Sequence, residues 1–262
     1  MMFCYEIKKV LGIKKRVAIG ILLALTSIYA LYGMVYRSAE QGIQEPFLDF
    51  SAFIDSLGMV MQFIVIFIVS ALYPMEQETG MTPMLLVTKY GEKNMDRVKV
   101  AAALAVTNLL VVMKGAVVFC GCYFAKHLNF DDMVSESYAV SLSSDPLVQT
   151  YGNIVCIQMI GFALGINFIA LVCLRLSVKI QKSFVTAIVC ALLCFIPGLI
   201  PESVPVLGIL GSLSPMCLAG RDSTYRVLFQ SGSYACTILH VGFLTYSVLI
   251  FLMIKCYQPV RA

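Results

Sequence analysis

The chain alternates between long apolar stretches and short polar segments. Six stretches are candidates for membrane spans, because a bilayer core of about 30 Å takes about 20 mainly apolar residues as a helix. They are approximately Val17–Tyr36, Ala52–Met75, Val98–Ala125, Tyr151–Leu174, Phe184–Ile200 and Ser233–Ile254. The fifth is short, and we expect Pro197 and Pro201 to end it, since proline lacks the N–H that a helix needs. None alternates as a barrel strand does, so the pattern predicts an all-α integral membrane protein with six transmembrane helices.

Basic residues gather on one side of these predicted helices. With the N-terminus in the cytoplasm, fourteen lysines and arginines fall inside and four fall outside, which follows the positive-inside rule. The inner ones are Lys8, Lys9, Lys14, Lys15, Arg16, Lys89, Lys93, Arg97, Lys99, Arg175, Lys179, Lys182, Lys255 and Arg261. The outer ones are Arg37, Lys126, Arg221 and Arg226. We therefore expect both termini in the cytoplasm.

The composition agrees with a membrane protein. Apolar residues make up 60% of the chain, against roughly 45–50% in an ordinary soluble domain. The net charge of +4 reflects orientation in the membrane. No soluble segment carries a basic patch interleaved with aromatic residues, so nucleic acid is not an expected partner. Residues 1–262 are interpreted as a single transmembrane domain.

The first sixteen residues combine an apolar face with lysines. Phe3, Ile7, Val10 and Leu11 have helical spacing, which favours an amphipathic helix over 1–16 lying in the cytoplasmic interface. The alternative is a basic flank that only orients the first span. That span is long for the apolar core of a cleaved signal peptide, so we interpret it as a signal anchor.

Motifs of soluble enzymes are missing from the sequence. The only histidines are His127 and His240, which excludes a metalloprotease HExxH motif, and there is neither a Walker A loop nor a GxSxG elbow. Most of the ten cysteines fall within predicted spans, where they act as small apolar residues. We expect no catalytic residue, no metal site and no cofactor in this chain.

The segment 76–99 carries the sharpest signal. It begins with acidic residues, and a glycine then permits a turn. The short apolar group Met84, Leu85 and Leu86 follows, and basic residues lead into the third span. The residues are Glu76, Glu78, Gly80, Met84, Leu85, Leu86, Thr88, Gly91, Arg97 and Lys99. Such a segment can be a helix on which a partner docks, or a solvated connector. The residues alone leave both readings open.

In its order of features this segment resembles the first cytoplasmic loop of the type-2 permeases of ABC exporters. The matching positions are Glu78, Gly80, Leu85-Leu86, Thr88-Lys89-Tyr90-Gly91 and Lys99. The opening Tyr5-Glu6-Ile7-Lys8-Lys9 and the six-span pattern extend the resemblance over nearly the whole chain. Pro83 and Glu92 depart from the family pattern.

The resemblance implies a set of partners. The loop would be a coupling helix that contacts a separate ATP-binding subunit, which would hold ATP and Mg. Its partner-binding residues would be Glu78, Gly80, Leu85, Leu86, Thr88, Gly91 and Lys99. A second permease chain, identical or different, and membrane lipid would complete the assembly in a plasma membrane of the prokaryotic type.

The outer segment 201–231 contains an apolar run, Val204–Leu213, that is too short to span a bilayer. Its hydrophobicity argues against an ordinary exposed loop. The resemblance implies a partly re-entrant hairpin before the last helix.

The resemblance also places the substrate pathway between two permeases, beside the second and fifth helices. Those helices are almost wholly apolar, which suits an amphipathic substrate such as a peptide, a drug or a lipid, although lipid-facing helices have the same composition. The candidate residues are Met59, Phe63, Phe67, Lys114, Leu192 and Phe195. Lys114 lies inside the third span, where it would bind an anionic substrate group or pair with a carboxylate such as Asp55. Gln62, Asn153, Gln158 and Asn167 are candidates for interhelical hydrogen bonds.

The sequence thus favours the permease subunit of an ATP-driven exporter. An ion-coupled secondary transporter remains an alternative, although no internal repeat is evident. A membrane-embedded enzyme would need clustered Glu, His or Asp within the spans, which the sequence does not show. A membrane scaffold without transport is a further alternative.

Overall fold

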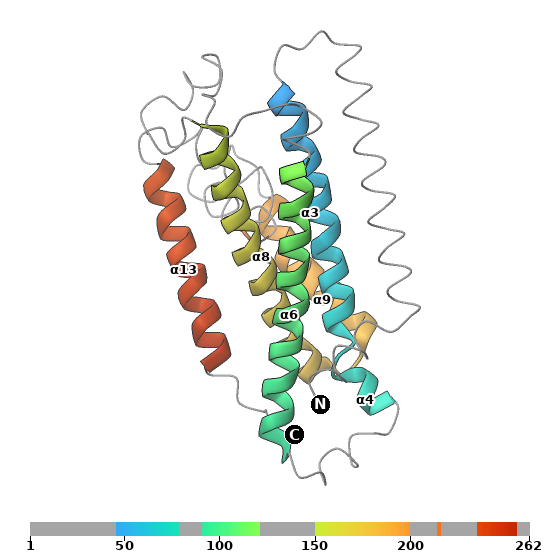
Figure 1. Cartoon of the computed structure of the whole chain (residues 1–262). Helices are drawn as coiled ribbons and strands as arrows, with labels where there is room; N and C mark the ends of the chain where they lie inside the picture. Colours follow the sequence, from blue (N-terminus) through green and yellow to red (C-terminus); the bar gives the residue numbers. More distant parts are fainter. Residues whose placement is uncertain (1–45, 79–90, 121–149, 200–213, 216–234, 256–262) are drawn as a thin grey trace.

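The computed structural model describes residues 46–78, 91–120, 150–199, 214–215 and 235–255. Regular structure in these ranges is helical and forms a bundle of helices that run side by side (Figure 1). The elements are α3 (Pro46–Ser70), α4 (Pro74–Glu78), α6 (Gly91–Cys120), α8 (Tyr151–Ile180), α9 (Ser183–Phe195), the 3₁₀ helix η3 (Ile196–Leu199) and α13 (Ala235–Lys255).

Three of these helices contain stretches long and apolar enough to cross a membrane: Leu57–Glu76, Asp96–Cys120 and Val155–Ile180. Ser183–Gly198 and Val241–Lys255 are shorter apolar helices. The described residues therefore confirm the prediction of helical structure, with three helices that have the length and composition of membrane spans. The predicted first span Val17–Tyr36 and interfacial helix 1–16 lie outside them, as does the outer segment 201–231 apart from Ser214 and Pro215, which are both buried.

The second predicted span is divided by a proline. α3 ends at Ser70 and α4 begins at Pro74, because the first position of a helix is where a missing N–H costs least. The turn between them keeps helix-like hydrogen bonds, with the Leu72 N–H donating to the Val69 carbonyl at 3.2 Å and Met75 to Ala71 at 3.2 Å. The chain thus continues past Pro74 with a local break.

Three helices extend beyond the apolar stretches predicted for them. α3 begins at Pro46 rather than Ala52. α6 begins at Gly91 rather than Val98, so the last part of segment 76–99 is helical. α8 continues past Leu174 to Ile180. In all three cases the added turns carry charged residues, which a hydropathy pattern assigns to a loop although they are compatible with a helix.

α8 and α9 form a tight helical hairpin. Gln181 ends α8 in the left-handed conformation, with φ 58°, and its N–H donates to the Ser177 carbonyl at 3.2 Å. Lys182 then precedes α9 directly. The α-helical part of α9 ends just before Pro197, as predicted, and the chain tightens into η3.

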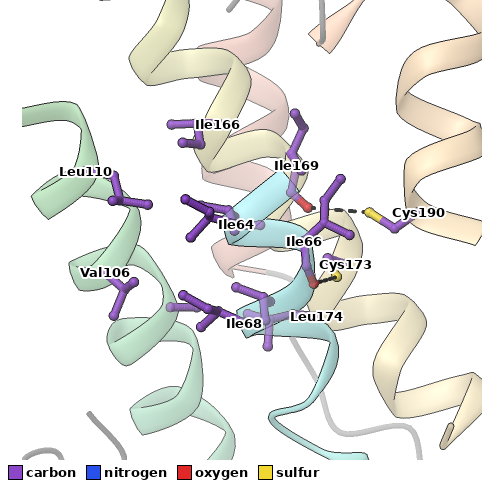
Figure 2. Close-up of a cluster of buried hydrophobic side chains, with 14 of the residues drawn as sticks. Ile64, Ile66, Ile68, Val106, Leu110, Ile166, Ile169, Cys173, Leu174 and Cys190 are labelled. Carbon is purple, nitrogen blue, oxygen red and sulfur yellow. Dashed lines mark hydrogen bonds between the residues drawn. The ribbon is translucent and has the colours of Figure 1, made fainter. Parts of the chain in front are cut away.

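α8 is the central helix and packs against α3, α6, α9 and α13. The buried core lies where α3, α6 and α9 meet it, and Figure 2 shows its main residues. Two thiols there donate to carbonyl oxygens of neighbouring helices, Cys173 to Ile66 at 3.6 Å and Cys190 to Ile169 at 4.0 Å. Cysteine thus fills the core as a small residue that also has a weak donor.

Candidate functional site

Four polar side chains meet where α4 follows α3 and α6 begins. Lys99 forms an ion pair with Glu76, and its amine lies 4.0 Å from the centre of the Tyr73 ring. The Tyr73 hydroxyl donates to Oδ1 of Asp96 at 2.7 Å. We call Tyr73, Glu76, Asp96 and Lys99 the inner clasp. It joins both sides of the segment 79–90 that the sequence singles out.

The local sequence explains how the inner clasp assembles. Asp96 and Lys99 are three residues apart on α6, so they share one face of that helix. Tyr73 and Glu76 are equally spaced on the other side, where the Glu76 N–H donates to the Tyr73 carbonyl at 3.1 Å. Each side therefore presents two polar groups at matching spacing.

The inner clasp is withdrawn from solvent. The exposed fraction is 1% for Lys99, 3% for Glu76 and 7% for Asp96. A buried charge is costly unless it is paired, and the loss of one partner leaves the other charge buried and uncompensated. The aromatic ring adds a second attraction for the ammonium group. Because each buried charge needs its partner, the cluster favours one particular packing of α4 against α6.

Three of the predicted partner-binding residues, Glu78, Gly91 and Lys99, belong to the described residues next to this junction. Glu78 is the last residue of α4, and Gly91 is the first residue of α6. Gly80, Leu85, Leu86 and Thr88 lie outside the described residues. Lys99 is turned into the bundle, where its amine contacts Glu76 and Tyr73. Lys99 is therefore placed to hold α6 against Glu76 and Tyr73, and it is not placed to contact a partner protein directly.

Sequence reasoning did not single out Tyr73, Glu76 and Asp96 as a cluster with Lys99. A usable signal exists in retrospect. A pair of polar residues three positions apart flanks the loop on each side, Tyr73 and Glu76 before it and Asp96 and Lys99 after it. What the sequence does not provide is the register of α3 and α4 against α6, which decides whether these faces meet.

The predicted pathway residues of the second and fifth helices lie together. Met59, Phe63 and Phe67 are one helical turn apart on α3, and Leu192 and Phe195 lie on α9, which packs against α3. The rings of Phe63 and Phe195 stack with centroids 4.7 Å apart and an interplanar angle of 11°. We call these five residues the α3–α9 face.

This face is open to the surroundings of the chain. Phe67 is 61% exposed and Leu192 is 52% exposed, whereas Phe195 is partly buried against the core. The face has no charged member, so it offers dispersion contacts and aromatic rings to a neighbouring apolar surface.

Lys114, the remaining pathway candidate, is placed elsewhere. It is buried on α6 and lies over the ring of Phe162 on α8, with 3.8 Å between its amine and the ring centre. The helices approach closely here, since a Cβ on Gly115 would come within 3.2 Å of Cε of Met159. Asp55, the suggested carboxylate partner, belongs to α3, but its side chain lies outside the described residues. Lys114 is thus a residue of the α6–α8 interface.

The same interface carries a polar ladder that runs from the buried Thr107 to the exposed Asn108. The Thr107 hydroxyl lies 2.7 Å from Oδ1 of Asn167, whose amide nitrogen donates to Oδ1 of Asn108 at 3.2 Å. This arrangement matches the predicted role of Asn167 in holding helices together. Gln158 is also buried on α8, but neither atom of its side-chain amide has a hydrogen-bond partner among the described residues.

Within the described ranges, no group of three or more His, Cys, Asp or Glu side chains is arranged to hold a metal ion. Comparison of the chain with protein-family models, with characterised proteins and with solved structures found no match.

Proposed function

We propose that this chain is the permease subunit of an ATP-driven ABC exporter, which moves an amphipathic peptide, drug or lipid across the plasma membrane. A separate subunit binds ATP and Mg and performs the hydrolysis, so this chain is not itself an enzyme. The inner clasp is the observation that carries the proposal, because it joins the helical elements that precede and follow segment 79–90. A docking segment for an ATPase needs such an attachment if it is to move the helices.

The distribution of basic residues supports a cytoplasmic position for this segment. Exposed Arg97, Lys179, Lys182 and Lys255 belong to helix ends that Figure 1 places at the same end of the bundle as α4. By the positive-inside rule this end faces the cytoplasm, where an ATP-binding subunit is available. Six spans with both termini inside are the topology that we propose.

The α3–α9 face supplies the second part of the proposal. Its residues are apolar, and all except Phe195 are exposed, as expected for a surface that meets a second permease chain and borders the pathway. ATP-driven closure of two ATPases would displace segment 79–90 in each chain, and the helices attached to it would switch the cavity between inward and outward access. The direction of transport, export, rests on the family resemblance.

A pull-down from the native membrane in mild detergent tests the proposal. The tagged chain should retain a stoichiometric protein that carries a Walker A sequence. The double variant Leu85→Asp/Leu86→Asp should insert normally but lose that protein, because charges replace the apolar group. Lys179→Asp, which alters charge at the same end of the bundle outside the segment, is the matched control and should retain it. An intact wild-type chain that retains no such protein contradicts the proposal.

Ion-coupled transport is a second candidate, favoured by the buried charges of Glu76, Asp96 and Lys99 at the ends of two apolar spans. Ionisable groups in such positions mark ion or proton pathways in many transporters. Purified chain in vesicles loaded with a pH-sensitive dye separates the two candidates. Proton flux without any ATPase, abolished by Glu76→Gln, would favour ion coupling, and its absence would leave the exporter proposal in place.

A further inference from the structure

We propose that the inner clasp is the mechanical link of the transporter: it joins α4 to α6 so that a displacement of segment 79–90 moves α6 as a rigid rod. This inference rests on the proposed function, since it assigns the residues through which a docked ATPase acts. It gives Tyr73, Glu76, Asp96 and Lys99 a positioning role, without contact to substrate or nucleotide.

The connection between α4 and α6 needs such a link. The intervening segment 79–90 has twelve residues, and a chain of that length can extend to roughly 40 Å. The ion pair between Glu76 and Lys99 and the hydrogen bond between Tyr73 and Asp96 hold the ends together.

The clasp is built to resist separation. Tyr73 contacts both residues of α6, with its hydroxyl on Asp96 and its ring under the amine of Lys99. Separation of the helices would break the ion pair, the hydrogen bond and the ring contact together. Because the charges are buried, water does not replace the lost interactions until the junction has opened.

α6 is suited to carry the movement. It is an uninterrupted helix of 30 residues, about 45 Å long at 1.5 Å per residue. The other side of the clasp is different, because Pro74 interrupts the helical path between α3 and α4. Force applied at the junction can therefore bend the chain in the turn between Ser70 and Tyr73, outside the clasp, while α6 moves as one piece. The far end of this rod carries Cys120, an exposed free thiol.

Cys120 provides the readout. The wild-type complex with its ATPase partner is placed in lipid nanodiscs, and maleimide labelling of Cys120 is followed by peptide mass spectrometry, with and without ATP plus vanadate. Nucleotide trapping should change the labelling rate several-fold. Lys99→Met and Glu76→Gln should lose this change while they bind the ATPase at the wild-type ratio and keep the wild-type labelling rate without nucleotide. The exchange Glu76→Lys/Lys99→Glu should restore the change.

Lys179→Met is the matched control, because it removes an exposed positive charge at the same end of the bundle; its nucleotide response should equal that of the wild type. Retention of the full response by Lys99→Met and Glu76→Gln would overturn the inference, as would a wild-type complex that shows no response. If the single variants do not insert, the same labelling of Cys120 is measured on the double variant Glu76→Leu/Lys99→Met, since apolar replacement of a buried pair is commonly tolerated. A lost response supports the link and a full response overturns it. Failure of the wild-type chain to bind any ATPase would instead contradict the proposed function.

Discussion

Lys114 of α6 directs its ammonium group at the ring of Phe162 on α8, 3.8 Å from the ring centre. Both side chains are buried, with exposed fractions of 1% and 0%. A cation over an aromatic ring gains up to about 2 kcal/mol when both are withdrawn from water. The contact therefore gives Lys114 a role in joining two helices, whatever further role it has in transport.

A double-mutant cycle measures this contact. Lys114→Met, Phe162→Leu and the double variant are unfolded in mixed micelles, and the free energies of unfolding are compared. We expect a coupling energy of about 1–2 kcal/mol, because each single variant already removes the interaction. A coupling energy near zero would show that the ring and the ammonium contribute independently.

The polar ladder between α6 and α8 should contribute measurably to stability. Asn167→Ala removes the partners of Thr107 and Asn108, and we expect the free energy of unfolding to fall by about 1 kcal/mol, within the range for interhelical hydrogen bonds in membranes. Asn153→Ala is the control, because Asn153 is exposed in the first turn of the same helix. Equal losses in the two variants would argue against a specific role for the ladder.

The α3–α9 face can be tested with a fluorescent reporter, because the chain contains no tryptophan. Phe67→Trp and Phe251→Trp place a single tryptophan at positions with the same exposed fraction, 61%. In membranes that contain brominated lipid, we expect the tryptophan at position 251 on α13 to be quenched and the one at 67 to be shielded. Equal quenching would identify the α3–α9 face as a lipid-facing surface.

The turn between α8 and α9 should become more stable on substitution by glycine. Gln181 has a φ of 58°, which costs an L-residue roughly 1–2 kcal/mol relative to its preferred conformations. Gln181→Gly should raise the free energy of unfolding by about 0.5–1 kcal/mol. Lys182→Gly is the comparison, since Lys182 has a φ of −127° and gains nothing from glycine there. The melting temperatures of the two variants should move in opposite directions.

The hydropathy pattern predicted which parts of the chain are helical, but it did not predict the residues at which the helices begin and end. The apolar stretches around Phe63, Val106 and Ile166 all became parts of helices, because twenty apolar residues have few alternatives in a bilayer. The ends differed where charged residues continued a helix beyond the apolar stretch, as Arg97 and Lys99 do on α6. A charge ends the apolar pattern, but it does not end helical hydrogen bonding.

The candidate site was predictable in part. Phe63 and Phe195 were assigned to a common pathway. That assignment stays a prediction, but their rings do stack where α3 packs against α9. Lys114 was grouped with them, yet it is buried against Phe162 on another side of the bundle. The inner clasp was not predicted, because the second span was expected to end at Met75 and Glu76 was assigned to the loop. The pairing of Glu76 with Lys99 also depends on how two helices pack, which the sequence does not show.

The hairpin of α8 and α9 has a consequence for how the protein is made. α9 has only 13 residues before its 3₁₀ turn, fewer than the ~20 that a helix needs to cross a bilayer on its own. It follows α8, a helix of 30 residues, after a connection of only Gln181 and Lys182. A ribosome that has delivered α8 to the membrane therefore presents α9 beside it almost at once. We therefore expect α8 and α9 to enter the bilayer as a pair, because α9 is too short to cross it alone.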